Sequence, residues 1–192
     1  MDKNKIKKFF DERAYNWDNT IYINPPVINK ILEFAKVEEG KSVLDIACGT
    51  GVLFDYYLKR DVKSIMAIDL SDEMVKVANE KYNNEKLTVE CADAYEFNKG
   101  TYDCIMIYNA FPHFDDQPKL IEHLCSLLNK KGTLTVAHGM SIEKLKARHT
   151  NASEVSRGPI SLEDLNNIMS KYGTIIASVS DDSMFCMTLE KE

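Results

Sequence analysis

The chain has 192 residues, with 24 basic and 30 acidic side chains and a net charge of −6. At roughly 150 residues per domain, this length fits one domain with its own core. The negative balance argues against a nucleic-acid partner, whose phosphates attract basic surfaces. No run approaches the roughly 18 apolar residues of a membrane span, and no apolar segment follows the basic N-terminus. We therefore expect a cytoplasmic protein with no membrane span.

Cysteine usage indicates a reducing environment. The chain has five cysteines, an odd number, widely spread and never in a Cys-x-x-Cys pair, which argues against a disulfide framework or a zinc cluster. We expect most of them to be reduced and buried in strands; they are Cys48, Cys91, Cys104, Cys125 and Cys186.

The first 40 residues predict helices that precede a sheet. Apolar residues recur at three- and four-residue steps over 6–17, which is typical of one amphipathic helix ending in aromatics. A second helix is expected over 27–35, after two prolines and before Gly40. Residues 1–40 are therefore interpreted as an N-terminal helical cap.

From Ser42 onward, β-branched runs alternate with helical periods, which predicts βαβ units and a parallel sheet. Lys130, Lys131 and Gly132 are interpreted as the basic last turn and glycine stop of the third of these helices. Strands are expected at 42–47, 64–69, 87–91, 102–108 and 132–138, and helices near 52–60, 72–83 and 117–129.

The C-terminal end departs from this alternation. Residues 161–164 form a capping box that opens a helix through Lys171, and two strands, 174–180 and 184–189, follow with three residues between them. Three residues cannot hold a crossover, so these strands must pair antiparallel. We predict one Rossmann-like α/β domain with a seven-stranded, mostly parallel sheet, a reversed last strand and helices on both faces. Its parts are the cap (1–40), a core (41–138), a substrate loop or lid (139–160) and a helix with a hairpin (161–192).

Ligands of such sheets bind beyond the carboxyl ends of the strands, where this chain places glycines and acids. The first strand carries Asp45 and runs into the turn Cys48-Gly-Thr-Gly51, whose small residues allow a ligand to touch the backbone. Asp69 ends the second strand, 20 residues after Gly49, and can accept both ribose hydroxyls. Asp93 follows the third strand and can accept a proton from an exocyclic amine.

These features alone fit either a dinucleotide dehydrogenase or another adenosine-binding protein. Phe54 stands where a dinucleotide fold needs its third glycine, which disfavours the dehydrogenase. Taken singly, Asp69 and Asp93 could also be helix N-caps, as acids after strands often are. Their joint occurrence behind Asp45 and the glycines favours an adenosine-containing ligand.

The four strand ends together resemble the class I S-adenosylmethionine-dependent methyltransferases, in particular the small ubiquinone/menaquinone and arsenite methyltransferase group. The stretch 43–51 resembles the first motif of that family, with Ala47 where glycine often stands. Stretches 67–71, 91–94 and 102–113 resemble the next three motifs, and the resemblance covers residues 9–138. The reversed last strand is also the topology of that family.

The resemblance implies S-adenosylmethionine as donor, S-adenosylhomocysteine as product and a set of donor-binding residues. Gly49 and Gly51 would lie against the carboxypropyl chain and Asp69 would hold the ribose. The adenine would lie between Leu70 and Met74 with its polar edge at Asp93 and Ala94, and Asn109 would lie near the methionine amine. Aromatic residues of the cap would close over the donor. The full set is Tyr15, Trp17, Asp45, Ala47, Cys48, Gly49, Gly51, Asp69, Leu70, Met74, Asp93, Ala94 and Asn109.

The acceptor side carries histidines. His113 follows the fourth strand, His138 ends the fifth and His149 comes in the next segment, whereas His123 is interpreted as part of a helix surface. We expect His113 and His138 to contact or deprotonate the acceptor. Without a larger insertion, the acceptor should be a small molecule. It could be anionic, since segment 139–160 carries Lys144, Lys146, Arg148 and Arg157.

Three other interpretations stay open. In a metal-assisted variant, His113, His138 and His149 would bind a divalent ion that orients an oxygen nucleophile, whereas the preferred interpretation assigns no metal. A non-catalytic donor-binding protein and, less favoured, a nicotinamide oxidoreductase are the others. The chain could act as a monomer or a homodimer.

Overall fold

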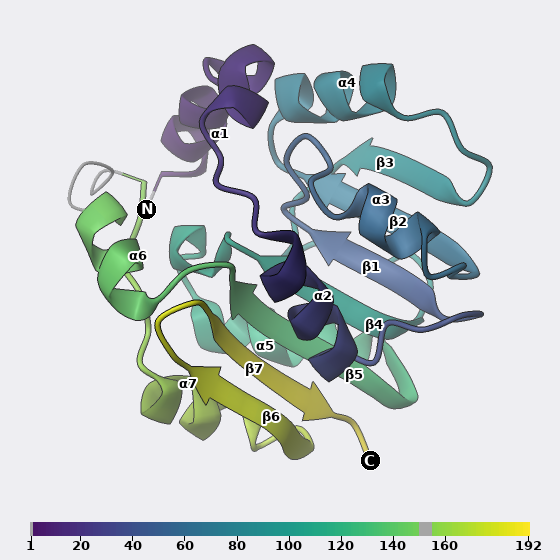
Figure 1. Cartoon of the computed structure of the whole chain (residues 1–192), viewed down its shortest axis with the longest axis vertical. Helices are drawn as coiled ribbons and strands as arrows, with labels where there is room; N and C mark the ends of the chain where they lie inside the picture. The colour runs from purple at the N-terminus through teal and green to yellow at the C-terminus, as the bar shows by residue number, and fades with distance from the viewer. Residues whose placement is uncertain (1, 150–154) are drawn as a thin grey trace.

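The computed structural model of the chain describes residues 2–149 and 155–192. Its centre is one seven-stranded sheet in the order β3-β2-β1-β4-β5-β7-β6 (Figure 1). The strands are β1 (Ser42–Ile46), β2 (Ser64–Asp69), β3 (Leu87–Cys91), β4 (Tyr102–Tyr108), β5 (Leu128–His138), β6 (Thr174–Ser180) and β7 (Phe185–Glu190).

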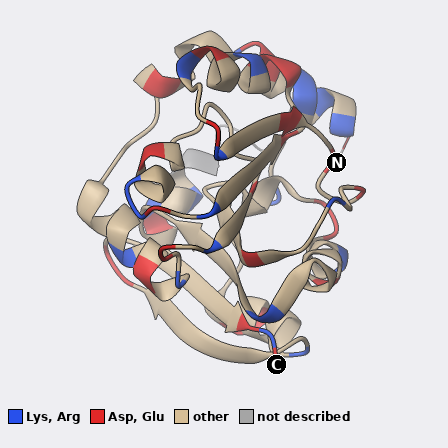
Figure 2. Cartoon of the chain, turned by 90° about the vertical axis from the view of Figure 1, so that its right-hand side faces the viewer, with Lys and Arg blue, Asp and Glu red and all other residues tan. Residues whose placement is uncertain are grey.

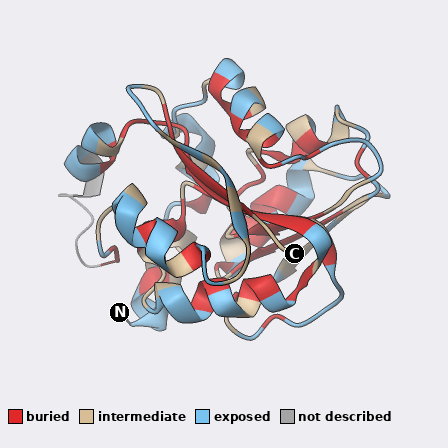
Figure 3. Cartoon of the chain, turned by 90° about the horizontal axis from the view of Figure 1, so that it is seen from below, coloured by how far each residue is buried: buried red, intermediate tan, exposed pale blue. Residues whose placement is uncertain are grey.

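Helices cover both faces of this sheet. One face packs against α2 (Pro25–Phe34), α3 (Phe54–Leu58) and α4 (Asp72–Lys81), and the other against α5 (Gln117–Ser126) and α7 (Leu162–Met169). The short helices α1 (Lys3–Asp11) and η1 (Ala14–Asn19) lie beside α4, η2 (Phe111–His113) follows β4, and α6 (Ile142–His149) follows β5. Because both faces are covered, β1 and β4 are almost continuously buried. The interior of the molecule is largely red, the colour of buried residues, in Figure 3.

The direction of the strands confirms the predicted topology. The ladders β1–β2, β1–β4, β2–β3 and β4–β5 are parallel, whereas β7 is antiparallel to both β5 and β6. Asp181 shapes the turn between the last two strands, because its Oδ1 accepts from the backbone N–H groups of Ser183 and Met184. The sheet therefore reverses only at its last strand, as expected.

The strand order also fixes where a ligand can bind. β1 lies between β2 and β4, and the chain runs from β1 outward to β2 and β3 before it returns to β4 on the other side of β1. A crevice opens at such a switch point, beyond the carboxyl ends of the strands. α4 begins at this edge, shortly after the end of β2, and Ser71 caps its N-terminus by accepting from the backbone N–H of Met74.

Two helix predictions were wrong. The single helix expected over 6–17 is divided into α1 and the 3₁₀ helix η1, since Tyr15, Asn16 and Trp17 are weak helix formers. The helix expected over 117–129 ends at Ser126, and 128–132 belong to β5. Gly132 is therefore not a helix stop. A Cβ there would lie 2.9 Å from the backbone oxygen of Asn129, so its role is close packing.

Most charged residues lie on the outside of the fold (Figure 2), and most cysteines lie inside it. Charged side chains lie mainly on helices and loops, and the strands are largely free of them in Figure 2. All five cysteines are free, and all but Cys91 are buried. Within the described residues, no helix is long and apolar enough to cross a membrane. His123, expected on a helix surface, is instead half-buried, and its Nε2 lies 2.7 Å from the oxygen of Phe97.

Candidate functional site

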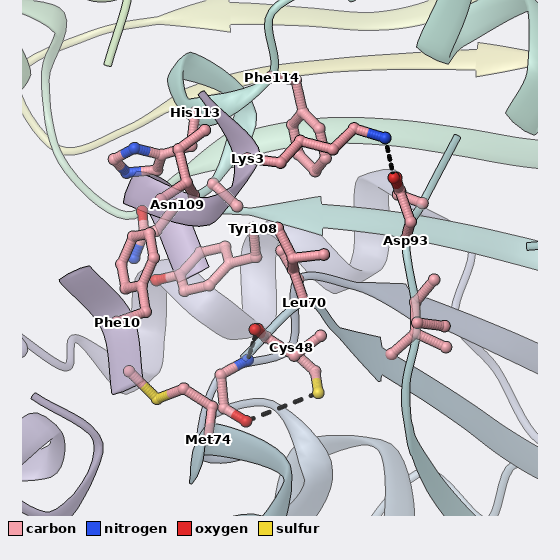
Figure 4. A pocket seen from close by; sticks show the side chains of 18 of the residues that line it. Lys3, Phe10, Cys48, Leu70, Met74, Asp93, Tyr108, Asn109, His113 and Phe114 are labelled. Atoms are coloured by element: carbon pink, nitrogen blue, oxygen red, sulfur yellow. Dashed lines mark hydrogen bonds and ion pairs between the residues drawn. The ribbon is translucent and has the colours of Figure 1, made fainter. Parts of the chain in front are cut away.

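A cavity of about 410 Å³ opens at the crevice beside β1 and β4. Its floor comes from the residues that follow β1, β2, β3 and β4, and its roof comes from α1, η1 and the segment after η1 (Figure 4). This volume lies within the range of small-molecule sites. Its lining includes Lys3, Ile6, Phe10, Trp17, Tyr22, Ala47, Cys48, Gly49, Asp69, Leu70, Met74, Ala92, Asp93, Ala94, Tyr95, Tyr108, Asn109, Ala110, His113 and Phe114.

The turn after β1 exposes backbone to the cavity. Ala47, Gly49 and Gly51 all have left-handed backbone, with φ values of 55°, 55° and 89°. A Cβ on Gly49 would lie 3.7 Å from Nε1 of Trp17, and one on Gly51 would lie 2.4 Å from the ring of Phe54. Trp17 of the cap thus lies directly against the backbone of Gly49. Ala47 has a left-handed conformation that glycine adopts easily, which explains why glycine often occupies this position in the resembling motif.

Asp69 organises the same turn from β2. Its Oδ2 accepts from the N–H of Gly49 at 2.8 Å and its Oδ1 accepts from the N–H of Ser71 at 2.9 Å. The residue is 9% exposed, and burial raises the pKa of its carboxyl in spite of these bonds. Each oxygen keeps acceptor capacity, so the carboxylate can tie β1 to α4 and still accept from a hydroxyl.

A second acid, Asp45, lies deeper in β1. It is 2% exposed, and burial raises its pKa to about 8, with the nearby charge of Asp69 acting in the same direction. Asp45 does not line the cavity. The interior of β1 therefore holds a carboxyl that is mostly protonated at neutral pH, directly before the cavity turn.

Two residues with left-handed backbone border the cavity where β1 and β4 end side by side. Asn109 follows β4 with φ 56°, as Ala47 follows β1 with φ 55°. The Oδ1 of Asn109 accepts from the N–H of Gly139 at 3.0 Å, which joins the end of β4 to the end of β5. Left-handed residues other than glycine are uncommon and concentrate at functional sites.

Asp93 is already paired across the cavity. Lys3, from α1, donates to its Oδ2, and the backbone N–H of Tyr95 donates to its Oδ1 at 2.9 Å (Figure 4). The hydrogen bond with Asp93 raises the pKa of Lys3. Asp93 therefore combines a turn-capping role with an ion pair that ties the cap to the end of β3.

His113 faces the cavity from η2. Its Nδ1 lies 2.7 Å from the backbone oxygen of Val155. A carbonyl only accepts, so Nδ1 carries the proton, and in the neutral ring Nε2 is the basic nitrogen. Phe10 of the cap packs edge-on against the imidazole, with ring centroids 5.1 Å apart.

Arg157 fastens the segment that contains Val155 to η2 and to Asp115. Its backbone N–H donates to the oxygen of Pro112 at 2.9 Å, and its guanidinium pairs with Asp115 at 2.6 Å. The segment that carries Val155 is thereby fixed to η2. The protonation pattern of His113 is thus set by residues more than 40 positions later in the chain.

Most of the residues expected to bind a donor lie around this one cavity. The lining contains Trp17, Ala47, Cys48, Gly49, Asp69, Leu70, Met74, Asp93, Ala94 and Asn109. Three do not line it: Tyr15, which is 61% exposed, and the buried Asp45 and Gly51.

The three histidines expected on the acceptor side do not lie together around the cavity. His113 lines the cavity, whereas His138 is 2% exposed beside Phe185 and does not. His149 is the last residue of α6, and its side chain lies outside the described residues. Across the part of the chain that is described, no three His, Cys, Asp or Glu side chains come together as a metal site. The metal-assisted interpretation therefore gains no support.

Sequence reasoning missed several lining residues, namely Lys3, Ile6, Phe10, Tyr22 and Tyr95. Four of them belong to the first 22 residues, where spacing indicates helix faces but not which face meets the sheet. The apolar stripe that includes Phe10 was the one available signal, since an exposed stripe must find a partner surface.

Comparison with known proteins adds independent information. A family model described as a methyltransferase domain matches residues 44–136. Malonyl-acyl-carrier-protein O-methyltransferase 1 of Ilyobacter polytropus is 29% identical over 191 residues, which span 94% of this chain and 71% of that protein. The ubiquinone biosynthesis O-methyltransferase of Vibrio cholerae is 32% identical over 143 residues, 69% of this chain and 58% of the relative.

A solved structure shares the whole fold. Magnesium protoporphyrin IX methyltransferase from Synechocystis PCC 6803, crystallised with bound S-adenosylmethionine, matches with a TM-score of 0.73 and 16% identity. The match covers 100% of this chain and 98% of that one. The arrangement of the sheet and its helices is therefore the one seen in that methyltransferase.

Proposed function

Because the chain belongs to the S-adenosylmethionine-dependent methyltransferases, we propose that its 410 Å³ cavity holds the donor beside the acceptor. The methionine tail would lie on the turn 47–51 and the ribose hydroxyls on Asp69. The adenine would lie between Leu70 and Met74, with its amine at Asp93. The convergence of four strand ends and the cap on this cavity carries the proposal.

Methyl transfer from S-adenosylmethionine is a displacement at carbon. A lone pair of the acceptor forms the new bond to the methyl carbon as the carbon–sulfur bond breaks. The sulfonium takes up that electron pair and becomes the thioether of S-adenosylhomocysteine. Holding donor and acceptor in line can supply much of the acceleration, so the main task of the chain is placement. A roof of Phe10 and Trp17 over the cavity suits this task, because it excludes water.

His113 is the proposed general base. Its Nδ1–H is held by the oxygen of Val155, so Nε2 is the basic nitrogen of the neutral ring and would take the proton from the acceptor. The buried His138, placed away from the cavity lining, is better suited to supporting the end of β5. We therefore assign the direct contact with the acceptor to His113 alone.

The proposed acceptor is a small molecule that offers an oxygen atom. Both sequence relatives above are named as O-methyltransferases, which supports oxygen as the nucleophile. A base is needed for a hydroxyl and not for a carboxylate that is already ionised, so His113 favours a hydroxyl acceptor. Five free cysteines support a cytoplasmic location.

Donor binding tests this proposal directly. S-adenosylmethionine and S-adenosylhomocysteine should raise the melting temperature, because a ligand at 100 times its dissociation constant adds about 2.7 kcal/mol to stability. NAD should have no effect. A shift with NAD alone would overturn the donor assignment.

A matched pair of acids locates the site. Asp69→Ala should weaken S-adenosylhomocysteine binding about a hundredfold, since it removes acceptors for Gly49, Ser71 and the ribose. Asp103→Asn is the control, because Asp103 also accepts from backbone, at Ser42, but on the opposite edge of the sheet. It should leave the affinity unchanged. Equal affinities in the two variants would place the donor elsewhere.

A further inference from the structure

We propose that Asp18 and Lys81 are positioning residues that fasten Trp17 over the donor turn and so raise donor affinity. This inference rests on the proposed donor site. Both residues lie outside the cavity lining. Their effect would pass through the turn and through Trp17.

Three segments meet at this pair. Asp18 belongs to η1, Lys81 is the last residue of α4, and Thr50 is the middle of the turn after β1. The Asp18 carboxylate accepts from the Thr50 hydroxyl through Oδ1 at 2.5 Å and from Lys81 Nζ through Oδ2 at 2.6 Å. Lys81 Nζ also donates to the backbone oxygen of Thr50 at 2.9 Å. The contacts close a ring in which every member touches the other two.

This ring restrains Thr50, the middle residue of the turn after β1. Thr50 is 1% exposed and stands between Gly49 and Gly51, whose left-handed backbone gives the turn many alternatives when unbound. Holding both the hydroxyl and the carbonyl of Thr50 removes much of that freedom before the donor arrives. A turn that is already ordered loses less conformational entropy when the donor binds, so the affinity for the donor rises.

The same ring places Trp17. Trp17 precedes Asp18 and lies over Gly49, with Nε1 3.7 Å from the position of a Cβ there. Its ring packs edge-on against Phe10, at 5.5 Å between centroids, and Phe10 packs in turn against His113. Ala14 packs with Met74 and Val77 of α4, and Trp17 packs against the same cluster, so apolar contacts hold η1 to α4. The polar ring adds hydrogen bonds that join η1 to the turn itself.

The pair should matter for binding more than for folding. The side chains of Lys81 and Asp18 are 34% and 45% exposed, and exposed ion pairs contribute little to global stability. The turn has another anchor in the bond from Gly49 to Asp69, and the start of α4 is capped by Ser71. Removing Asp18 or Lys81 should leave the melting temperature almost unchanged while donor affinity falls, which a merely structural role would not produce.

Trp17 supplies the measurement, because it is the only tryptophan in the chain. We expect its fluorescence to change when S-adenosylhomocysteine binds the native protein. Asp18→Asn and Lys81→Met should shift the unliganded emission to the red and weaken S-adenosylhomocysteine binding about tenfold. The double variant should be no weaker than either single one, since each removal breaks the same ring. Lys81→Arg keeps the charge and should restore most of the affinity.

The ion pair of Asp61 and Lys86 is the matched control. Its side chains are 70% and 33% exposed, and it lies before β2 and β3 at the opposite edge of the sheet. Asp61→Asn and Lys86→Met should leave both emission and affinity at native values. Native affinity and emission in Asp18→Asn and Lys81→Met would overturn the inference, as would an equal loss in the control variants. Failure of the native protein to bind S-adenosylhomocysteine would instead overturn the proposed donor site.

Discussion

The two halves of the cavity are built differently. The donor half, at the ends of β1, β2 and β3, consists of short turns whose backbone groups face the cavity, and Asp69 joins two of them. The half proposed for the acceptor, around the ends of β4 and β5, depends on side chains from distant segments. His113 is held by Val155, and Phe10 lies against it from the other end of the chain.

The difference shows which half is free to change. A turn fixed by left-handed residues and by one buried acid tolerates few substitutions, because each alters backbone geometry. A roof made of side chains can be altered one residue at a time without disturbing the sheet. The proposed donor site therefore depends on the fold, and the proposed acceptor site on residues added to it.

Replacing His113 should separate the two halves most clearly. His113→Asn should lower turnover about a thousandfold, or about 4 kcal/mol in activation free energy, because it removes the proposed base. The affinity for S-adenosylhomocysteine should stay near its native value. Turnover is measured by the transfer of labelled methyl from the donor to a hydroxyl acceptor, and the affinity for S-adenosylhomocysteine by calorimetry.

His123 provides the control for that experiment. Its ring also meets a backbone oxygen, that of Phe97 at 2.7 Å, but on α5 and away from the cavity lining. His123→Asn should keep native turnover. If His113→Asn were as active as His123→Asn, the acceptor half would contain no base at this position.

Gly51 should show how rigid the donor half is. Gly51→Ala puts a Cβ 2.4 Å from the ring of the fully buried Phe54, on backbone at φ 89°. We expect a loss of about 3 kcal/mol in the free energy of unfolding, measured in urea. Gly40→Ala has a similar φ of 75° and no neighbour within 4 Å, so it should cost only about 1 kcal/mol. Equal losses would mean that backbone strain alone, and not packing, fixes the turn.

Asp45 should give the donor half a pH dependence. Its pKa is raised by burial from 3.8 to about 8 in the folded protein. Between these values the unfolded chain releases the proton and the folded one keeps it, so stability falls as pH rises and levels off above about 8. Compared with Asp45→Asn, the native protein should lose about 2 kcal/mol between pH 6 and pH 8, in urea titrations. Parallel curves for the two proteins would contradict the raised pKa.

Much of the fold followed from local patterns. The alternation of apolar runs predicted all seven strands, and the three-residue link after β6 predicted the reversed last one. The errors fell where the pattern continued past a structural break. Leu127 and Leu128 extend the apolar face of α5, yet the chain turns there into β5, and Leu128 pairs with Tyr102 of β4.

The site divides in the same way. Asp69, Gly49 and Asn109 lie at or just beyond the carboxyl ends of neighbouring parallel strands, so parallel pairing was enough to predict that they would lie close together. Tyr15 was expected among them and points to solvent instead, whereas Lys3 and Phe10, which were not expected, line the cavity. Helical spacing indicates which residues share a face, and it does not indicate what that face will meet.

Local sequence patterns were enough to predict the parallel sheet, its reversed end and the turn proposed to receive the donor, because each depends on residues within a few positions of one another. The contacts of Lys3 with Asp93, of Asp18 with Thr50 and of Val155 with His113 became evident only in the folded chain. Those contacts join residues 32 to 90 positions apart. Such pairs are selected by the packing of whole elements, which short-range spacing does not encode.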